Sequence, residues 1–142
     1  MKENDMQKPA DFFSKYQETA FKKDVAGMIS LYDEDVEVFD MWERGYFSGL
    51  EEWAAVITGW LTSLNEEKVN VIFELINIHE SDEIAFAHAL IQYQAIAAGG
   101  NILRSMKNRI SIGLINKNGA WKVKHQHTSA PVDSTLKAIL DI

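Results

Sequence analysis

The chain of 142 residues contains no cysteine, which excludes disulfide bridges, thiolate-bound metals and cysteine nucleophiles. Proline is almost as scarce, because Pro9 and Pro131 are the only two and stand at either end of the body of the chain. Pro9 lies where the first turn of a helix tolerates proline, and Pro131 lies where a last strand could end. Repeats, low-complexity segments and linkers are also missing, which favours one continuous domain.

Positive charge is in deficit as well. The 14 Lys and Arg residues are outnumbered by 21 Asp and Glu residues, which gives a net charge of −7. This balance argues against a nucleic-acid partner, which needs a basic surface, and against binding to anionic membranes. No run approaches the roughly 18 apolar residues of a membrane span, and the polar start of the chain has no secretory signal. We therefore expect a cytoplasmic protein.

What the chain does have is enough apolar material for one core. Its length is typical of a single domain, which we expect to span residues 1–142. Within it we expect a flexible N-terminal segment at 1–9 and a C-terminal tail at 132–142. Four Trp, four Tyr and seven Phe residues suit a core or the walls of an apolar cavity.

Three stretches have the periodicity or the end signals of helices. Between residues 10 and 23, apolar side chains recur at steps of three and four residues, which predicts an amphipathic helix. Asp24 has the place of an N-cap before a short second helix. Gly49 precedes a third helix, which carries apolar residues from Leu50 to Leu64.

Most of the remaining chain has the pattern of strands. The alternation around Val36 and Val38 predicts a short strand that ends at Asp40. Longer strands are predicted at 69–79, 84–97, 102–115 and 120–129. Ser81-Asp82 marks a turn, and the sequence NKNG at 116–119 marks a hairpin before the last strand. We expect the tail at 133–142 to form a helical turn or two.

Three helices and a short strand followed by an antiparallel meander predict an α+β fold. The long strands exceed the common length of about 5–6 residues, and a long twisted meander tends to curl. Helices packed across the concave face of such a curved antiparallel sheet leave room for a ligand-sized cavity.

Two parts of the chain resemble known families. The sequence DVAGMISLYDEDVEVFD at 24–40, followed by GLEEW at 49–53, resembles the ketosteroid isomerase and SnoaL-like cyclase group. The C-terminal half resembles the association domain of calcium/calmodulin-dependent kinases through QY at 92–93, AGG at 98–100, Arg104, GAW at 119–121 and HQHTSAP at 125–131. Both resemblances imply the cone-shaped, nuclear transport factor 2-like or cystatin-like roll. They leave the activity open, because this superfamily contains isomerases, cyclases, dehydratases and non-catalytic domains.

Asp40 and Tyr16 are the first candidates for catalysis. Asp40 precedes large apolar residues, which would raise its pKa toward the range of a general base, and the resemblance implies the role of the proton-abstracting Asp of ketosteroid isomerase. The spacing of Tyr16 from Asp24 matches the Tyr that donates to the enolate oxygen in that enzyme. The alternatives are an Asp that caps a loop and a Tyr that belongs to the core.

The resemblance also implies a second donor, a protonated Asp on the strand that matches residues 107–112. The chain has no acid there, so steroid isomerisation itself is not expected. Asn108 could donate a neutral hydrogen bond in its place, or Arg109 could hold an anionic group.

His125 and His127 alternate on the last predicted strand, so we expect them on one face together with Trp121 and Val123. If that face packs on the helices, the two histidines line the cavity. If it packs on a partner sheet, they lie in a dimer interface, and the opposite face at 124, 126 and 128 lines the cavity. The sequence leaves both arrangements open.

His88 lies mid-strand among apolar residues, and we consider it for proton transfer or for a structural role. A metal site would need a third ligand besides His125 and His127, from His88 or Asp40. We expect no metal, and no cofactor because the chain has no phosphate-binding glycine loop. Trp42, Trp60 and Phe73 are possible cavity walls.

Two hypotheses for function follow. In the first, the protein binds a small, partly apolar molecule and could abstract a proton next to a carbonyl group, as isomerases and cyclases do. In the second, it is a non-catalytic oligomerising or ligand-sensing module. A homodimer fits both, because closed two-fold pairs are the commonest assembly.

Overall fold

The computed structural model describes residues 5–142. Within them, three helices precede or interrupt six strands. The helices are α1 (Asp11–Lys22), α2 (Val25–Ile29) and α3 (Leu50–Thr62). The strands are β1 (Tyr32–Phe39), β2 (Tyr46–Ser48), β3 (Lys68–Glu80), β4 (Ile84–Ile96), β5 (Ile102–Lys117) and β6 (Ala120–Ser129). The predicted helices and long strands are confirmed, whereas β2 was not predicted.

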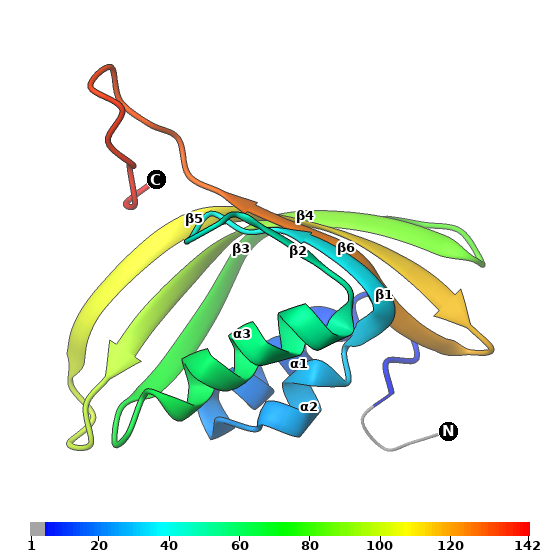
Figure 1. The fold of residues 1–142 in the computed structure, drawn as a ribbon, viewed down its shortest axis with the longest axis horizontal. Helices are drawn as coiled ribbons and strands as arrows, with labels where there is room; N and C mark the ends of the chain where they lie inside the picture. Colours follow the sequence, from blue (N-terminus) through cyan, green and yellow to red (C-terminus); the bar gives the residue numbers. More distant parts are fainter. Residues whose placement is uncertain (1–4) are drawn as a thin grey trace.

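The strands form a single curved, unclosed sheet in the order β2-β1-β6-β5-β4-β3. Neighbouring strands are antiparallel except β1 and β6, which are parallel. The three helices lie on the concave side of the sheet (Figure 1). This arrangement confirms the α+β fold with helices across the concave face. No helix in the described part of the chain is long and apolar enough to span a membrane.

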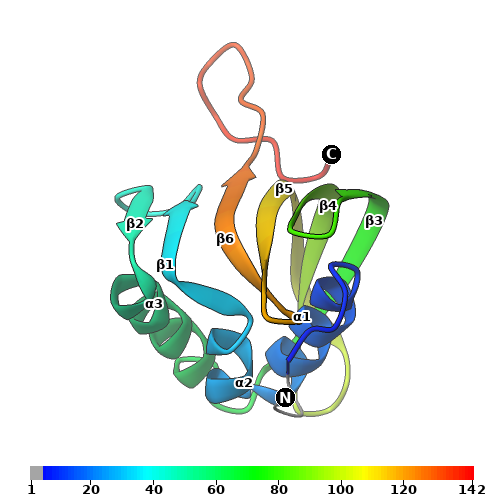
Figure 2. The same cartoon turned by 90° about the vertical axis from the view of Figure 1, so that its right-hand side faces the viewer.

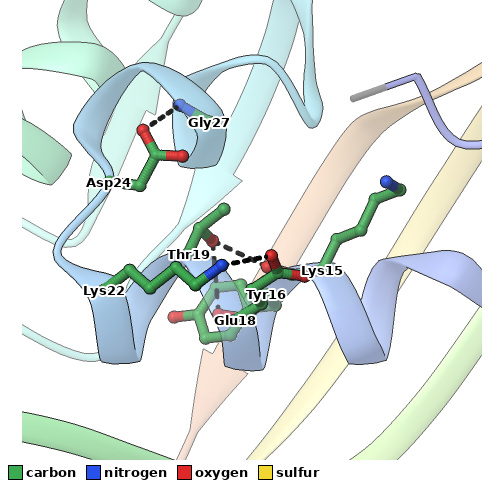
Figure 3. Close-up of polar contacts among 7 residues, drawn as sticks. All are labelled: Lys15, Tyr16, Glu18, Thr19, Lys22, Asp24 and Gly27. Atoms are coloured by element: carbon green, nitrogen blue, oxygen red, sulfur yellow. Dashed lines mark hydrogen bonds and ion pairs between the residues drawn. The ribbon is translucent and has the colours of Figure 1, made fainter. Parts of the chain in front are cut away.

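The corner between α1 and α2 is set by its sequence. Lys23 ends α1 in the left-handed conformation, and the Asp24 carboxylate then accepts the Gly27 N–H at 2.9 Å. Figure 3 shows this bond together with the Thr19 hydroxyl, which donates to the Lys15 carbonyl at 2.8 Å. The structure thus confirms Asp24 as the N-cap of α2.

The core fills the space between the helices and the concave face of the sheet. Phe12 and Tyr16 of α1 and Ile57 of α3 are buried against strand residues of that face. On β4 the buried positions alternate from Ala85 to Ile91, which is the period expected for a strand with one face covered. The concave face is therefore the inside of the molecule.

One residue of β6 breaks the regular alternation of this strand. Val123 pairs with Leu114 and His125 pairs with Gly113, so Lys124 has no partner and forms a β-bulge. Trp121 and Val123 are buried on the concave side, whereas His125 and His127 are on the opposite, outer side. The expectation that the two histidines share a face with Trp121 and Val123 is wrong, because the bulge shifts the period by one.

Both ends of the described chain pack on the sheet. Trp121 N–H donates to the Met6 carbonyl at 2.8 Å and the Met6 side chain is buried, so the part of the expected flexible segment from residue 6 onward is packed. Residues 1–4 of that segment lie outside the described residues. The segment is packed, and not flexible as expected from residue 6 onward, because the Met6 side chain is buried in the core.

The C-terminal tail loops beyond the end of β6 and returns toward β5 (Figure 2). It contains no helix, so the predicted helical turn is wrong. The Asp133 carboxylate accepts the N–H groups of Thr135 and Lys137, at 2.8 and 3.2 Å, and such local bonds compete with helix formation. Lys107 N–H then donates to the Leu140 carbonyl at 2.6 Å, which holds the tail beside β5.

Candidate functional site

A cavity of about 490 Å³ lies between the helices and the concave face of the sheet. Helix α3 supplies one wall through Trp53, Val56, Ile57 and Trp60, and α1 supplies Tyr16. The sheet supplies Tyr93, Met106, Asn108, Gln126 and Thr128. The loop between β1 and β2 contributes Asp40, Trp42 and Glu43, and β2 contributes Phe47. The volume falls within the range of small-molecule sites.

Asp40 directly follows β1 and is held at the cavity wall by its neighbours. The Thr128 hydroxyl donates to Asp40 Oδ1 at 3.0 Å, and the Met41 N–H donates to the same Thr128 oxygen at 3.1 Å. Burial raises the pKa of Asp40, although the bonds from Thr128 and from main-chain N–H groups partly offset this effect. A carboxylate with a raised pKa is a better base than one in water.

Tyr16 is buried on the helix side of the same cavity. Its hydroxyl lies 2.9 Å from the Tyr93 hydroxyl, and either oxygen can be the donor. Burial raises the pKa of Tyr16 well above its usual value, and Tyr93, Tyr32 and Asp40 add to the shift. Tyr16 therefore stays protonated and can act as a hydrogen-bond donor.

The sequence reasoning did not identify Tyr93 as a cavity residue. A signal was available, since Tyr93 continues the alternation of Ala85, Ala87, Ala89 and Ile91 on β4. Tyr93 also has a pKa raised by burial. The pair of hydroxyl groups thus offers one proton beyond the bond that joins them.

Asn108 and Gln126 form the polar part of the sheet wall. Asn108 is 2% exposed, and its Nδ2 donates to the Met41 sulfur at 3.0 Å. Asn108 Oδ1 has no hydrogen-bond partner among the described residues. Gln126 Oε1 accepts the Tyr32 hydroxyl at 2.6 Å. Of the two arrangements left open for β6, the structure has the one in which residues 126 and 128 line the cavity.

Five of the proposed site residues lie away from this cavity. Phe73 packs behind Tyr16, with ring centroids 5.9 Å apart. His88 and Arg109 are exposed, because the alternation of β4 and β5 places them on the outer face. His125 and His127 are also on the outer face, where the Phe39 ring lies 5.2 and 5.5 Å from their rings. The cavity keeps Asp40, Tyr16, Trp42, Trp60 and Asn108.

Residues 5–142 contain no cluster of side chains suited to bind a metal ion. No three side chains of the His, Asp or Glu type come close enough there to hold one ion. His125 Nδ1 instead lies 2.7 Å from the Glu37 carbonyl oxygen. Asp40 and the histidines are on opposite faces of the sheet, so they do not combine into a site.

Comparison with known proteins places these features in a family. The model of the SnoaL-like domain matches residues 10–133, while no curated protein matches the chain. A nuclear transport factor 2-like protein of unknown function from Pseudomonas putida shares 22% identity over 94% of this chain and 92% of its own, with a TM-score of 0.80.

Two further solved structures are similar. A putative calcium/calmodulin-dependent protein kinase II association domain from Xanthomonas campestris shares 15% identity over 86% of this chain and 84% of its own, with a TM-score of 0.72. ActVI-ORFA from Streptomyces coelicolor shares 14% identity over 84% of this chain and 92% of its own, with a TM-score of 0.73. At these identities the likeness shows the fold.

Proposed function

Because this chain belongs to the SnoaL-like domain family, we propose that it binds a small, partly apolar molecule in the cavity and abstracts a proton next to a carbonyl group, as isomerases and cyclases do. One observation carries the proposal: the cavity brings together a carboxylate with a raised pKa, Asp40, and a protonated donor, Tyr16. A base and an electrophilic donor in one hollow are what enolisation requires.

In the proposed reaction, the Asp40 carboxylate takes a proton from the carbon beside the carbonyl. The electron pair of the C–H bond becomes the C=C bond of an enolate, and the π pair of the carbonyl group moves to its oxygen. The Tyr16–Tyr93 pair donates its free O–H to that oxygen. Asp40 then returns the proton to another atom of the ligand, so that the base is regenerated.

Thr128 is a positioning residue in this proposal. Its hydroxyl bonds to Asp40 Oδ1, and its oxygen is fixed in turn by the Met41 N–H. This pair of bonds orients the Asp40 carboxylate at the cavity wall. Rigid placement of a base in this way accounts for much of the rate that an enzyme gains.

The test is exchange of the α-hydrogens of 2-indanone, a small benzo-fused cyclic ketone, with deuterium, followed by NMR in D₂O. The wild-type protein should accelerate exchange above the buffer rate, and Asp40→Asn should lower the acceleration by about 10²-fold or more. Asp35→Asn is the matched control, since Asp35 is exposed on the same strand. Equal acceleration by wild type and Asp40→Asn would defeat the assignment of Asp40 as the base.

A second proposal, compatible with the first, is self-association through the outer face of the sheet. This face exposes large aromatic side chains, with exposed fractions of 46% for Phe39 and 57% for Phe86. The four long strands β3 to β6 have at least ten residues each, and at a spacing of about 4.8 Å they alone cover roughly 600 Å². This approaches the area of about 800 Å² that one partner buries in a standard interface. We therefore propose a homodimer as the assembly.

Size-exclusion chromatography with light scattering tests this assembly. The wild-type protein should have twice the chain mass of 16.1 kDa, and Phe86→Lys should shift it to the monomer, because a buried unpaired charge opposes association. Leu136→Lys is a matched control in the exposed tail. A wild-type protein that stays monomeric at high concentration argues against the second proposal and leaves the first intact.

A further inference from the structure

The charged side chains that line the cavity are all acidic. Asp40 and Glu43 are the ionisable carboxylates of its wall, and no Lys, Arg or His is among the described residues that line it. The chain has 14 Lys and Arg residues, so a shortage of basic residues does not explain their absence from this wall. A negatively charged ligand group would find no cationic partner in this wall and would face two carboxylates.

Aromatic rings make up much of the remaining wall. Three Trp residues, Phe47 and the two tyrosines of the hydroxyl pair surround the cavity. The face of an aromatic ring is electronegative and attracts cations, most strongly for Trp. Carboxylates and ring faces together form an environment that selects a cation over an anion.

The mouth of the cavity already shows this attraction within the protein. The Arg44 guanidinium lies over the Phe47 ring, 4.5 Å from its centroid. Arg44 is held there by the Glu52 carboxylate and by the Tyr46 carbonyl, to which its Nε donates at 3.0 Å. Its charge is therefore engaged outside the cavity, and it leaves Glu43 and Trp42 at the rim to a ligand.

The buried amide of Asn108 gives an independent sign of a ligand. Asn108 lines the cavity, and its Oδ1 has no hydrogen-bond partner among the described residues, in a side chain that is 2% exposed. A buried acceptor without a partner costs about 1–3 kcal/mol, which a ligand with a donor group would recover. This atom, like the two carboxylates, favours a donor and disfavours an anion.

We infer that the ligand carries a positively charged nitrogen, bound at the mouth between the Trp42 ring and the Glu43 carboxylate, with its uncharged carbonyl end deeper in the cavity beside Tyr16. The inference rests on the proposed function for the place of the ligand. It leaves Asp40 for the proton transfer, because the charge of the ligand is met at the rim by Glu43. Amine-bearing carbonyl compounds are the substrate class that follows.

Three probes of matched shape test the charge preference. These are (3-hydroxyphenyl)trimethylammonium, its uncharged isostere 3-tert-butylphenol, and the anion 3-hydroxyphenylacetate. Titration by calorimetry should show that the ammonium binds about tenfold more tightly than 3-tert-butylphenol, which corresponds to cation–π attraction and a nearby carboxylate. The anion should bind most weakly. Equal affinity for the ammonium and its isostere, tighter binding of the anion, or no detectable binding of the ammonium overturns the inference.

Variants at the rim locate the effect. Glu43→Gln and Trp42→Leu should each reduce the preference for the ammonium severalfold, and Glu43→Gln should leave the affinity for 3-tert-butylphenol unchanged. Glu51→Gln is the control, because Glu51 is an exposed carboxylate in the first turn of α3 outside the cavity wall. A preference that is equal in Glu43→Gln and Glu51→Gln overturns the placement at the rim.

The outcome is separable from that of the proposed reaction. Cation preference without ketone exchange would leave a binding protein for amines and refute the reaction. Exchange without cation preference would leave the reaction and refute the substrate class.

Discussion

Asp40 shows at the scale of a single residue how function opposes stability. Burial raises its pKa in the folded protein, whereas in the unfolded chain the value is about 3.9. The folded state therefore binds this proton more tightly than the unfolded state. As the pH rises from the unfolded value through the raised folded value, the folded protein loses stability, and the loss persists at neutral pH.

Asp40→Asn should consequently be more stable than wild type at pH 7, by a small amount because solvent screens a half-buried carboxylate. The difference should shrink as the pH is lowered toward the unfolded value. Urea denaturation at several pH values measures it, with Asp35→Asn as the exposed control. A variant that is less stable than wild type at neutral pH would contradict the raised pKa.

The ionisation of Asp40 should also make ketone exchange by the wild-type protein increase as the pH rises through the raised pKa.

Site prediction from the sequence succeeded where a resemblance or helical spacing placed the residue, and it failed for strand residues whose face of the sheet was not fixed. Asp40 and Tyr16 were placed by a resemblance and by helical spacing, and both reach the cavity. His88 and Arg109 were proposed for their chemistry alone, and the alternation of their strands turns them outward. Tyr93 was overlooked although the alternation of β4 places it on the inner face, and the structure shows its hydroxyl beside that of Tyr16.

At the scale of elements, the corner between α1 and α2 shows how one glycine is required by the packing of two helices. Gly27 lies where a side chain would strike the Asp24 carboxylate that caps α2, and a Cβ there would lie 2.9 Å from Thr19 Cγ2. The glycine is thus required by packing between α1 and α2, and not by its backbone angles.

Gly27→Ala should lower the free energy of unfolding by about 1–3 kcal/mol, through overpacking and loss of the cap. Gly59→Ala is the matched control, since nothing lies within 4 Å of a Cβ at Gly59 in α3. That change should stabilise the helix by about 0.5–1 kcal/mol. Urea denaturation of both variants decides, and similar midpoints for the two would refute the packing argument.

Elements with strong local signals were predictable, and those set by tertiary contacts were not. Asn118 and Gly119 have positive φ in the turn between β5 and β6, as the sequence of that hairpin indicates. Strand β2 has only three residues, too few for a period, and it forms because it pairs with the end of β1. The C-terminal tail does not form the predicted helical turn, because the Asp133 carboxylate accepts hydrogen bonds from its own neighbour Thr135.

At the scale of the whole molecule, one buried acid links β1 to the β5–β6 hairpin. Asp33 is 2% exposed and forms ion pairs with Lys117 and, at 3.6 Å, with Lys124. Burial acts to raise the pKa of Asp33, but the bonds from Lys117 and the Asp35 N–H outweigh it and the pKa is lowered. The resulting stabilisation is present above the unfolded pKa and is lost as the pH falls through the lower folded value.

Asp33→Asn should therefore cost about 1–3 kcal/mol of unfolding free energy at neutral pH. The gap to wild type should narrow in acid, where the carboxylate of wild type is protonated. Thermal unfolding at pH 7 and below pH 4 measures both, and Glu34→Gln on the exposed side of β1 is the control. If the difference in stability between wild type and Asp33→Asn stays constant with pH, the charge of Asp33 is not what stabilises the contact between β1 and the β5–β6 hairpin.

The bulge at Lys124 decides which chemistry the cavity receives. Strand β6 contains one residue more than its partner β5 can pair, and the surplus is absorbed at a single point, so that Gln126 and Thr128 face inward and the imidazoles face outward. A chain that lacked Lys124 would keep the same lining, because the regular alternation would then fall into step. If one further residue were inserted and paired with β5, the side chains after it would change faces. The imidazoles of His125 and His127 would then line the cavity in place of the Gln126 amide and the Thr128 hydroxyl. The insertion of one residue, without any change of fold, is thus enough to exchange the polar groups that line this cavity.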